Sequence, residues 1–163
     1  NAKLDRYKVI SFATHGIVAG ELLGTQEPGL ILTTPKSPTE EDDGILTASE
    51  ISRLKLRADW IILSACNTAA GGAGIDNAPL DGLARSFFYA GAKSLLVSHW
   101  AVDSLSTVEL TTRTVQLATQ SRSSFAISHQ KAMQAMIRSD NLNFVHPSAW
   151  AAFFVVGVAG APN

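Results

Sequence analysis

The sequence predicts an α/β fold in which a mostly parallel central sheet is covered by helices on both faces. Short apolar strands alternate along the chain with segments of helical character. These strands are apolar at nearly every position rather than at every second one, which is typical of strands buried on both faces. Alternation of such strands with helices favours a doubly wound sheet. Because the chain has 163 residues, 46% of them hydrophobic, we expect one domain over residues 1–163.

The first predicted strand covers residues 7–13 (YKVISFA) and stops at the polar sequence THG at 14–16. The run is short and rich in β-branched and aromatic residues, which favours a buried strand followed by a tight loop. Residues 20–44 then contain many glycines and prolines around one β-rich stretch at 30–34. We expect a hairpin or loop region there.

A helix start is marked by Thr47 and Glu50, which match a capping box. In this motif the threonine side chain accepts a bond from the backbone of the third helical residue, whose own side chain returns a bond to the threonine N–H. We therefore expect a short helix that ends near Leu54. The next strand is predicted over residues 60–64 (WIILS), again followed by small residues.

The second half of the chain continues the alternation of helices and strands. Gly91 favours the end of a helix, and the apolar run after it favours a strand. From these patterns we expect helices over 80–90, 103–120 and 124–138, and strands over 93–100 and 151–158.

Two residues with reactive side chains follow the first two buried strands. His15 lies just beyond the first strand, and Cys66 just beyond the second. Functional groups in parallel sheets gather beyond the carboxyl ends of the strands, and neighbouring strands are about 5 Å apart. An imidazole beside a thiol promotes formation of the thiolate nucleophile. A catalytic histidine about 50 residues ahead of the cysteine is also the arrangement of caspases.

Either residue alone has an ordinary structural interpretation. A single cysteine after an apolar strand is more often a small buried side chain than a nucleophile. The pairing of the two strand ends at this spacing makes a Cys66–His15 dyad the better hypothesis. Gly16 lets a substrate carbonyl approach the backbone, so its N–H and that of Cys66 are our candidates for an oxyanion hole.

Other patterns favour no site. The glycines at 71–74 lack a phosphate-loop pattern, and we interpret them as a loop. The acidic run at 40–43 lacks calcium-loop spacing, so we interpret it as a solvated loop. His99, His129 and His146 show no metal-ligand spacing, and we assign them structural roles. We expect neither a metal nor a cofactor.

Several longer motifs resemble those of the CHAT domain, a bacterial caspase-like domain often joined to tetratricopeptide repeats. The resemblance covers nearly the whole chain. It rests on SFATHG (11–16), DGILTASEI (43–51), LSACNTAAG (63–71), LDGLARSFFYAGAKSLLVSHWAVD (80–103) and HPSAWAAFFVVG (146–157).

The resemblance implies the C-terminal, catalytic portion of a caspase-like three-layer fold. It matches His15 and Cys66 to the catalytic dyad and Gly16 to the oxyanion glycine, and it implies hydrolysis of peptide bonds through an acyl-enzyme. Members have further strands and a helix ahead of the histidine strand. Since only six residues precede Tyr7, we expect this chain to lack the N-terminal strands.

The resemblance also implies that Trp100 and Asp103 lie in the substrate-binding region. Separases carry a comparable acid that suits a basic side chain before the scissile bond. Members usually have two consecutive acids there, whereas Asp103 is followed by Ser104. Asp103 as a pocket residue predicts a preference for Arg or Lys. Asp103 as the N-cap of the next helix is an equally good interpretation, and both stay open.

We therefore predict a cysteine endopeptidase acting on a protein or peptide substrate. The alternative is a regulatory protein-interaction module with a latent or inactive dyad, which an activating partner or the tetratricopeptide-repeat region would control. Thirteen basic and fourteen acidic residues, a formal charge of −1, disfavour nucleic-acid and membrane partners. One cysteine forms no internal disulfide, so we expect a reducing, cytoplasmic setting.

Overall fold

The central feature of the computed structural model is a four-stranded sheet in the order β1-β5-β6-β7. The structure describes residues 3–21, 26–39, 42–64, 79–121 and 123–158. The strands of this sheet are β1 (Val9–Phe12), β5 (Trp60–Leu63), β6 (Ser94–Ser98) and β7 (Phe153–Gly157). Strands β1, β5 and β6 are parallel, and β7 runs antiparallel to β6. The prediction of a mostly parallel central sheet is confirmed.

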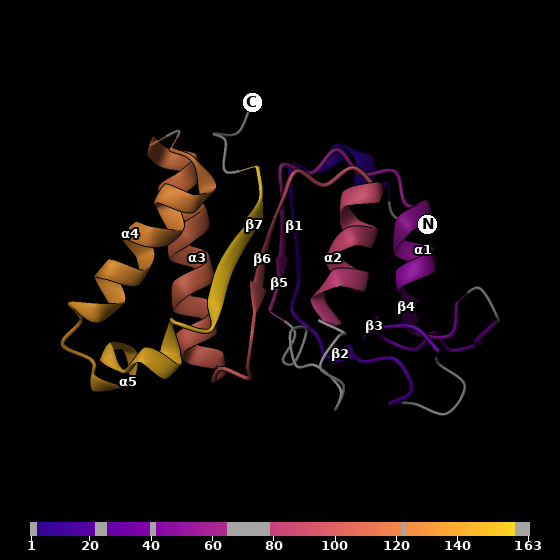
Figure 1. Cartoon of the computed structure of the whole chain (residues 1–163), viewed down its shortest axis with the longest axis horizontal. Coiled ribbons are helices and arrows are strands. Elements are labelled where there is room, and N and C mark those ends of the chain that lie inside the picture. The colour runs from indigo at the N-terminus through magenta and orange to yellow at the C-terminus, as the bar shows by residue number, and fades with distance from the viewer. Residues whose placement is uncertain (1–2, 22–25, 40–41, 65–78, 122, 159–163) are drawn as a thin grey trace.

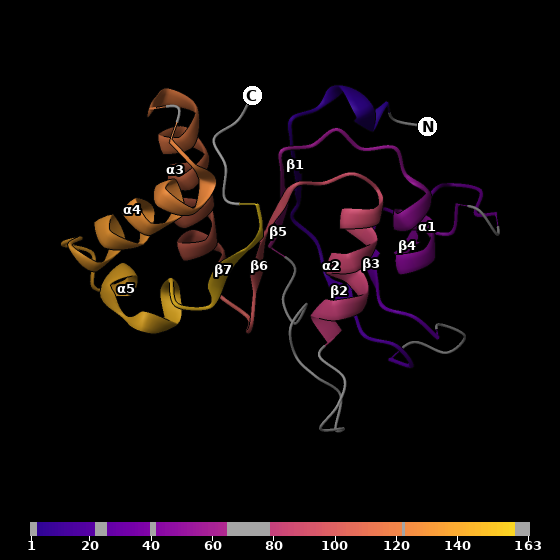
Figure 2. The ribbon, with the colours of Figure 1, turned by 45° about the horizontal axis from the view of Figure 1, so that its top comes forward.

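Helices cover both faces of this sheet, as Figure 1 shows. One face carries α1 (Ala48–Arg53) and α2 (Pro79–Tyr89), and the other carries α3 (Ser104–Ser121) and α4 (Phe125–Ile137). A view turned by 45° keeps the sheet between the two helix pairs (Figure 2). The chain therefore has the predicted three-layer α/β arrangement, consistent with a caspase-like fold.

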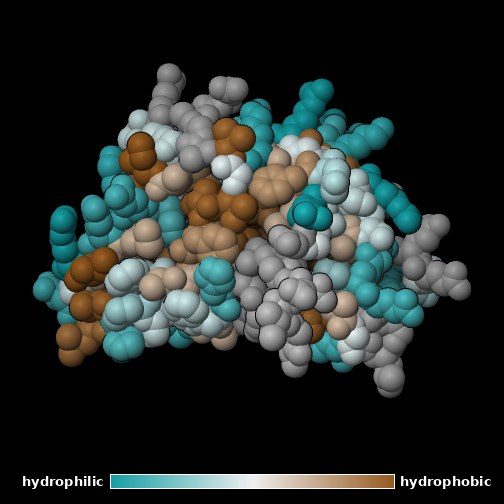
Figure 3. Space-filling model, in the orientation of Figure 1, coloured by the Kyte–Doolittle hydropathy of each residue, from teal (hydrophilic) through white to brown (hydrophobic). Residues whose placement is uncertain are grey.

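The two inner strands are buried along their whole length because both faces are covered. Every residue of β5 and β6 is buried. Side chains of a strand alternate between faces, so Ile61 and Leu63 pack with α1 and α2, whereas Trp60 and Ile62 pack with α3 and α4. Hydrophobic residues also gather along the strip between the two helix layers, over the edge strand β7 (Figure 3).

A second, smaller sheet lies beside the carboxyl end of β1. It contains β2 (Gly16–Ile17), β3 (Gly29–Ile31) and β4 (Ile45–Thr47), all antiparallel to their neighbours. The hairpin region expected at 20–44 contains β3, and β2 and β4 flank it on either side. The stretch expected at 30–34 begins one residue earlier and ends at Ile31. The capping box that starts α1 is confirmed in both directions, with Glu50 N–H donating to Thr47 Oγ1 at 3.3 Å.

An ion-paired carboxylate links the amino ends of the three parallel strands. Asp59 is buried immediately before β5. Its Oδ1 lies 2.6 Å from Lys93 Nζ, and its Oδ2 lies 3.6 Å from Lys8 Nζ. The two lysines precede β6 and β1, so the buried charge is compensated from both neighbouring strands.

His129 has the structural role that the sequence predicts. It is buried on α4, where its Nδ1 lies 3.4 Å from Thr114 Oγ1 of α3 and its Nε2 lies 3.2 Å from the carbonyl oxygen of Phe153. Burial lowers the pKa of this imidazole, and the bond to Phe153 partly opposes that effect. The side chain thereby ties α4 to α3 and to β7.

Two short elements after α4 were not predicted from the sequence. They are α5 (Leu142–Val145) and the 3-10 helix η2 (Pro147–Ala149), and another 3-10 helix, η1 (Leu4–Arg6), precedes β1. The described residues include no helix long and apolar enough to cross a bilayer.

Candidate active site

His15 lies where the chain leaves the large sheet for the small one. It comes three residues after β1 and one before β2. Its carbonyl oxygen accepts a hydrogen bond of 2.8 Å from the N–H of Ile31, and the preceding Thr14 hydroxyl donates to the carbonyl of the same isoleucine. The backbone is therefore held from β3, while the His15 side chain is exposed.

Cys66, the other member of the predicted dyad, lies outside the described residues. The description of its strand ends at Ser64, which directly follows β5. Ser64 N–H donates to the carbonyl oxygen of Phe12 at 3.2 Å, and its hydroxyl bonds to the same oxygen at 3.3 Å. The pairing of β1 with β5, Phe12 opposite Leu63, thus continues one residue beyond the strands. The two strand ends that carry the predicted dyad are direct neighbours.

Gly16, the predicted oxyanion glycine, pairs with Leu30 of β3. The hydrogen bond from Ile31 to His15 lies to one side of this pair, which makes Gly16 and Leu30 a non-hydrogen-bonded pair of the antiparallel ladder. In such a pair the N–H groups point away from the partner strand. The Gly16 N–H is therefore directed away from β3 and is not used in this ladder.

A pocket of about 410 Å³ opens beside His15 between the large sheet and α3. One wall comes from β1 and β5 and the residues after them, and the other from α3 and the segment before it. Its described lining is Ser11, Ala13, Thr14, His15, Ser64, Val102, Ser104, Thr107, Val108 and Thr111. We refer to this space below as the His15 pocket.

The strand side of the His15 pocket follows from the twofold repeat of a β-strand. Ser11 lies between Ile10 and Phe12 in β1, so its side chain is on the face opposite to theirs. The face of Ser11 is the one covered by α3 and α4, because Ile10 and Phe12 pack on the opposite side with α2. Ala13, Thr14 and His15 follow the strand and line the same pocket. Ser64 belongs to the same face as Ile62, whose side chain packs on the α3 side.

The helix side of the pocket was not identified from the sequence. Ser104, Thr107 and Thr111 occupy one side of α3 at helical spacing. Only their periodicity marks them, because Ser and Thr form no recognisable motif at this spacing. Thr111 donates its hydroxyl to the carbonyl of Thr107 at 2.7 Å.

Asp103 serves as the N-cap of α3. Its Oδ1 accepts a hydrogen bond of 3.0 Å from the N–H of Ser106, three residues on. The side chain of Ser106 and then its backbone N–H lower the pKa of Asp103, so the carboxylate is charged at neutral pH. Of the two roles proposed from the sequence, the capping role is the one that this geometry shows.

Asp103 also lines a second pocket of about 380 Å³, away from His15. This pocket lies between the start of α3 and the α5–η2 segment, and we call it the Asp103 pocket. Its lining is Asp103, Leu105, Asn141, Leu142, Asn143, Phe144, His146 and Ser148. Asp103 lines this pocket and not the His15 pocket, although its chain neighbours Val102 and Ser104 line the latter.

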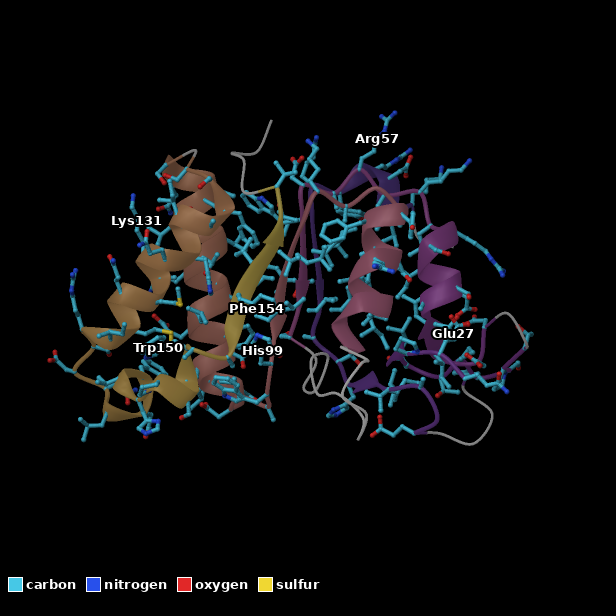
Figure 4. All side chains as sticks on the ribbon, viewed as in Figure 1. Glu27, Arg57, His99, Lys131, Trp150 and Phe154 are labelled. Atoms are coloured by element: carbon cyan, nitrogen blue, oxygen red, sulfur yellow. The ribbon has the colours of Figure 1, made fainter. Side chains whose placement is uncertain are left out.

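Trp100 lies at the same edge of the sheet, two residues after β6. Its side chain is 42% exposed, and its Nε1 donates to the carbonyl oxygen of Ser148 at 3.3 Å. The neighbouring His99 stacks on Phe154 of β7, with ring centroids 4.2 Å apart. Both residues are labelled in Figure 4. His99 does not line the His15 pocket.

The described residues contain no group of three or more His, Cys, Asp or Glu side chains able to hold a metal ion. In a comparison with known families, the model of the CHAT domain matches residues 1–158, nearly the whole chain. No curated protein matches this sequence.

Proposed function

Because the chain belongs to the CHAT domain family, a family associated with caspase-like cysteine peptidases, we propose that it is a cysteine endopeptidase whose nucleophile is Cys66. In this proposal His15 takes the thiol proton, the thiolate attacks a peptide carbonyl, and the imidazole then protonates the leaving amine. Water hydrolyses the acyl-enzyme. The substrate is a protein or a peptide, and the site works in a reducing, cytoplasmic setting.

The observation that carries the proposal is the parallel pairing of β1 with β5. Phe12 lies opposite Leu63, and His15 and Cys66 each follow these positions by three residues. Cys66 is two residues beyond Ser64, so chain connectivity alone keeps its Cα within about 7 Å of the Ser64 Cα. Ser64 and His15 line one pocket. These observations support our proposal that the Cys66 thiol pairs with the His15 imidazole.

The Gly16 amide supports the second part of the proposal. Its N–H makes no hydrogen bond to β3, so it is available to the substrate carbonyl oxygen, which becomes negative during attack. Such donors stabilise the transition state by about 3 kcal/mol each. We propose that Gly16 and Cys66 supply the two N–H groups of an oxyanion hole.

Peptide cleavage by wild type and by Cys66→Ala tests the proposal. Incubation with a mixed peptide library is expected to give new cleavage products with wild type and none with Cys66→Ala, because the alanine has no nucleophile. Alkylation of Cys66 by iodoacetamide at neutral pH is expected to exceed that of free cysteine. Equal cleavage by both proteins contradicts the assignment. Slow alkylation together with no cleavage favours a regulatory module with an idle dyad.

We extend the proposal to a preference for Arg or Lys before the scissile bond, supported by the charged and exposed Asp103 carboxylate. Trp100 would provide an apolar surface for the stem of such a side chain. Asp103 caps α3 through Oδ1, and in this proposal the carboxylate also faces the cation.

Two substitutions of Asp103 separate its two roles. Asp103→Ser keeps a capping side chain but removes the charge, whereas Asp103→Ala removes both. A substrate role predicts that both variants lose the preference for Arg and Lys over neutral residues, measured as kcat/KM on matched peptides. A capping role alone predicts an unchanged preference in both, with only Asp103→Ala less stable, by about 1 kcal/mol.

A further inference from the structure

We propose that the His15 pocket receives the side chain of the residue that follows the scissile bond, and that it selects an uncharged residue there. This inference rests on the peptidase function proposed above and names part of its substrate. Nothing in the family match assigns this pocket. The proposal concerns described residues of β1, β5 and α3.

The role of His15 places the residue after the bond in this pocket. To protonate the leaving amine, the imidazole must come within about 3 Å of the leaving nitrogen. That nitrogen belongs to the residue after the bond, whose Cα is one covalent bond away. Its side chain is therefore the substrate side chain nearest to the imidazole. Since His15 itself lines the pocket, this side chain enters it.

The lining of the pocket combines hydroxyl groups with apolar surface and, among the described residues, holds no Asp, Glu, Lys or Arg side chain. Among the described residues that line it, His15 is the only one with an ionisable side chain. The hydroxyls of Ser11, Ser104 and Thr107 make no hydrogen bond to another described residue, so they are available to a ligand. Val102 and Val108 supply the apolar part of the walls. This combination suits Ser, Thr, Asn, Ala or Val.

Charged substrate residues are disfavoured in this pocket for two different reasons. A Lys or Arg side chain meets the imidazolium that forms during attack and has no carboxylate in the described lining to compensate it. An Asp or Glu side chain pairs with that imidazolium and stabilises it, which opposes transfer of its proton to the leaving amine. An uncharged side chain avoids both effects.

The position of Asp103 supports the assignment of different substrate side chains to the two pockets. The acid lines the Asp103 pocket and does not line the His15 pocket. A basic substrate side chain that contacts Asp103 is therefore not the one beside His15. The side chain after the scissile bond contacts hydroxyl groups and valines, whereas a basic substrate side chain is recognised in the Asp103 pocket.

The first test compares peptides that differ only in the residue after the bond. The series places Ser, Val, Asp or Lys there in one sequence that the wild-type protein cleaves. We expect kcat/KM to be at least ten-fold higher for Ser and Val than for Asp and Lys. Similar values for all four residues overturn the inference.

Charge substitutions in the pocket wall provide the second test. Thr107→Lys is expected to raise the relative kcat/KM for Asp after the bond at least ten-fold, and Ser104→Glu to do the same for Lys. Ser104 is exposed, so its substitution does not depend on repacking. Gln116→Lys is the matched control, because Gln116 is exposed on α3 and does not line the pocket. Equal effects of Thr107→Lys and Gln116→Lys overturn the assignment of the pocket.

Binding to Cys66→Ala separates failure of this inference from failure of the peptidase function. The same four peptides, labelled with a fluorophore, are titrated by anisotropy without turnover. We expect Ser and Val peptides to bind at least five-fold more tightly than Asp and Lys peptides. Selective binding without cleavage by wild type contradicts the proposed function and leaves the pocket assignment in place. Equal binding of all four peptides overturns the pocket assignment whether or not cleavage occurs.

Discussion

Replacement of His15 by alanine is expected to lower kcat/KM for peptide cleavage by about 10²–10⁴-fold, the usual contribution of general acid–base catalysis. The loss has two parts: the thiol loses its base, and the leaving amine loses its acid. Stability is expected to change by less than about 0.5 kcal/mol, because the imidazole is exposed. The hydrogen bond to β3 involves the carbonyl of His15, which alanine keeps. Steady-state kinetics and urea unfolding measure the two quantities.

His99→Ala is the matched control for this experiment. His99 is also exposed and also follows a parallel strand of the large sheet, but it stacks on Phe154 and lies outside the His15 pocket. Its substitution is expected to change kcat/KM by no more than a few-fold. If His99→Ala reduces activity as strongly as His15→Ala, the base has been assigned to the wrong histidine. If His15→Ala keeps more than a tenth of the activity, no general base is required from His15.

The layers of the fold were predictable because burial on both faces leaves a strong pattern. Trp60–Leu63 and Ser94–Ser98 form the inner strands β5 and β6, and their runs are nearly free of polar interruption. The capping box at Thr47 fixed the start of α1 to the residue. In contrast, α5 has four residues and β2 has two. Elements this short contain only about one period of a hydrophobic pattern, which is too little to show a repeat, so tertiary contacts define them.

The site was predictable only where it follows a strand end. His15 and Cys66 were expected near each other because each follows a buried parallel strand, and the register confirms that these two strands are neighbours. Thr107 and Thr111 come from a helix some 90 residues further along the chain, and nothing local indicates which side of α3 faces β1. Asp103 had two equally good interpretations from sequence, and only its hydrogen bond to Ser106 shows the capping role. Cys66 stays a prediction, because it lies outside the described residues.

Phe87→Ala is expected to lower the free energy of unfolding by about 3–5 kcal/mol, the usual cost of removing a fully buried phenylalanine. Phe87 of α2 is 0% exposed, and its ring centroid lies 5.4 Å from that of Phe12 at the end of β1. Alanine leaves a cavity between this helix and the sheet. Urea unfolding measures the change, with an unchanged slope showing that the transition stays two-state.

Tyr89→Ala is the control, since it removes an aromatic ring two residues away on the same helix. Tyr89 is 81% exposed, so its loss is expected to cost less than about 0.5 kcal/mol. Both substitutions insert the same good helix former into α2, which cancels most of the effect of helix propensity. Equal destabilisation by the two variants would mean that α2 does not pack against β1 through Phe87.

The cavity left by Phe87→Ala is also expected to lower the catalytic rate, because Phe12 lies beside it. This residue ends β1 three positions before His15, and its side chain loses its main aromatic neighbour in Phe87→Ala. A shift of about 1 Å in a catalytic group can cost about 10²-fold in rate, so kcat is expected to fall about ten-fold well below the unfolding temperature. Phe87→Leu refills most of the space and is expected to recover most of both losses. Recovery of stability without recovery of kcat would show that the position of His15 is set by β3 rather than by the core beneath β1.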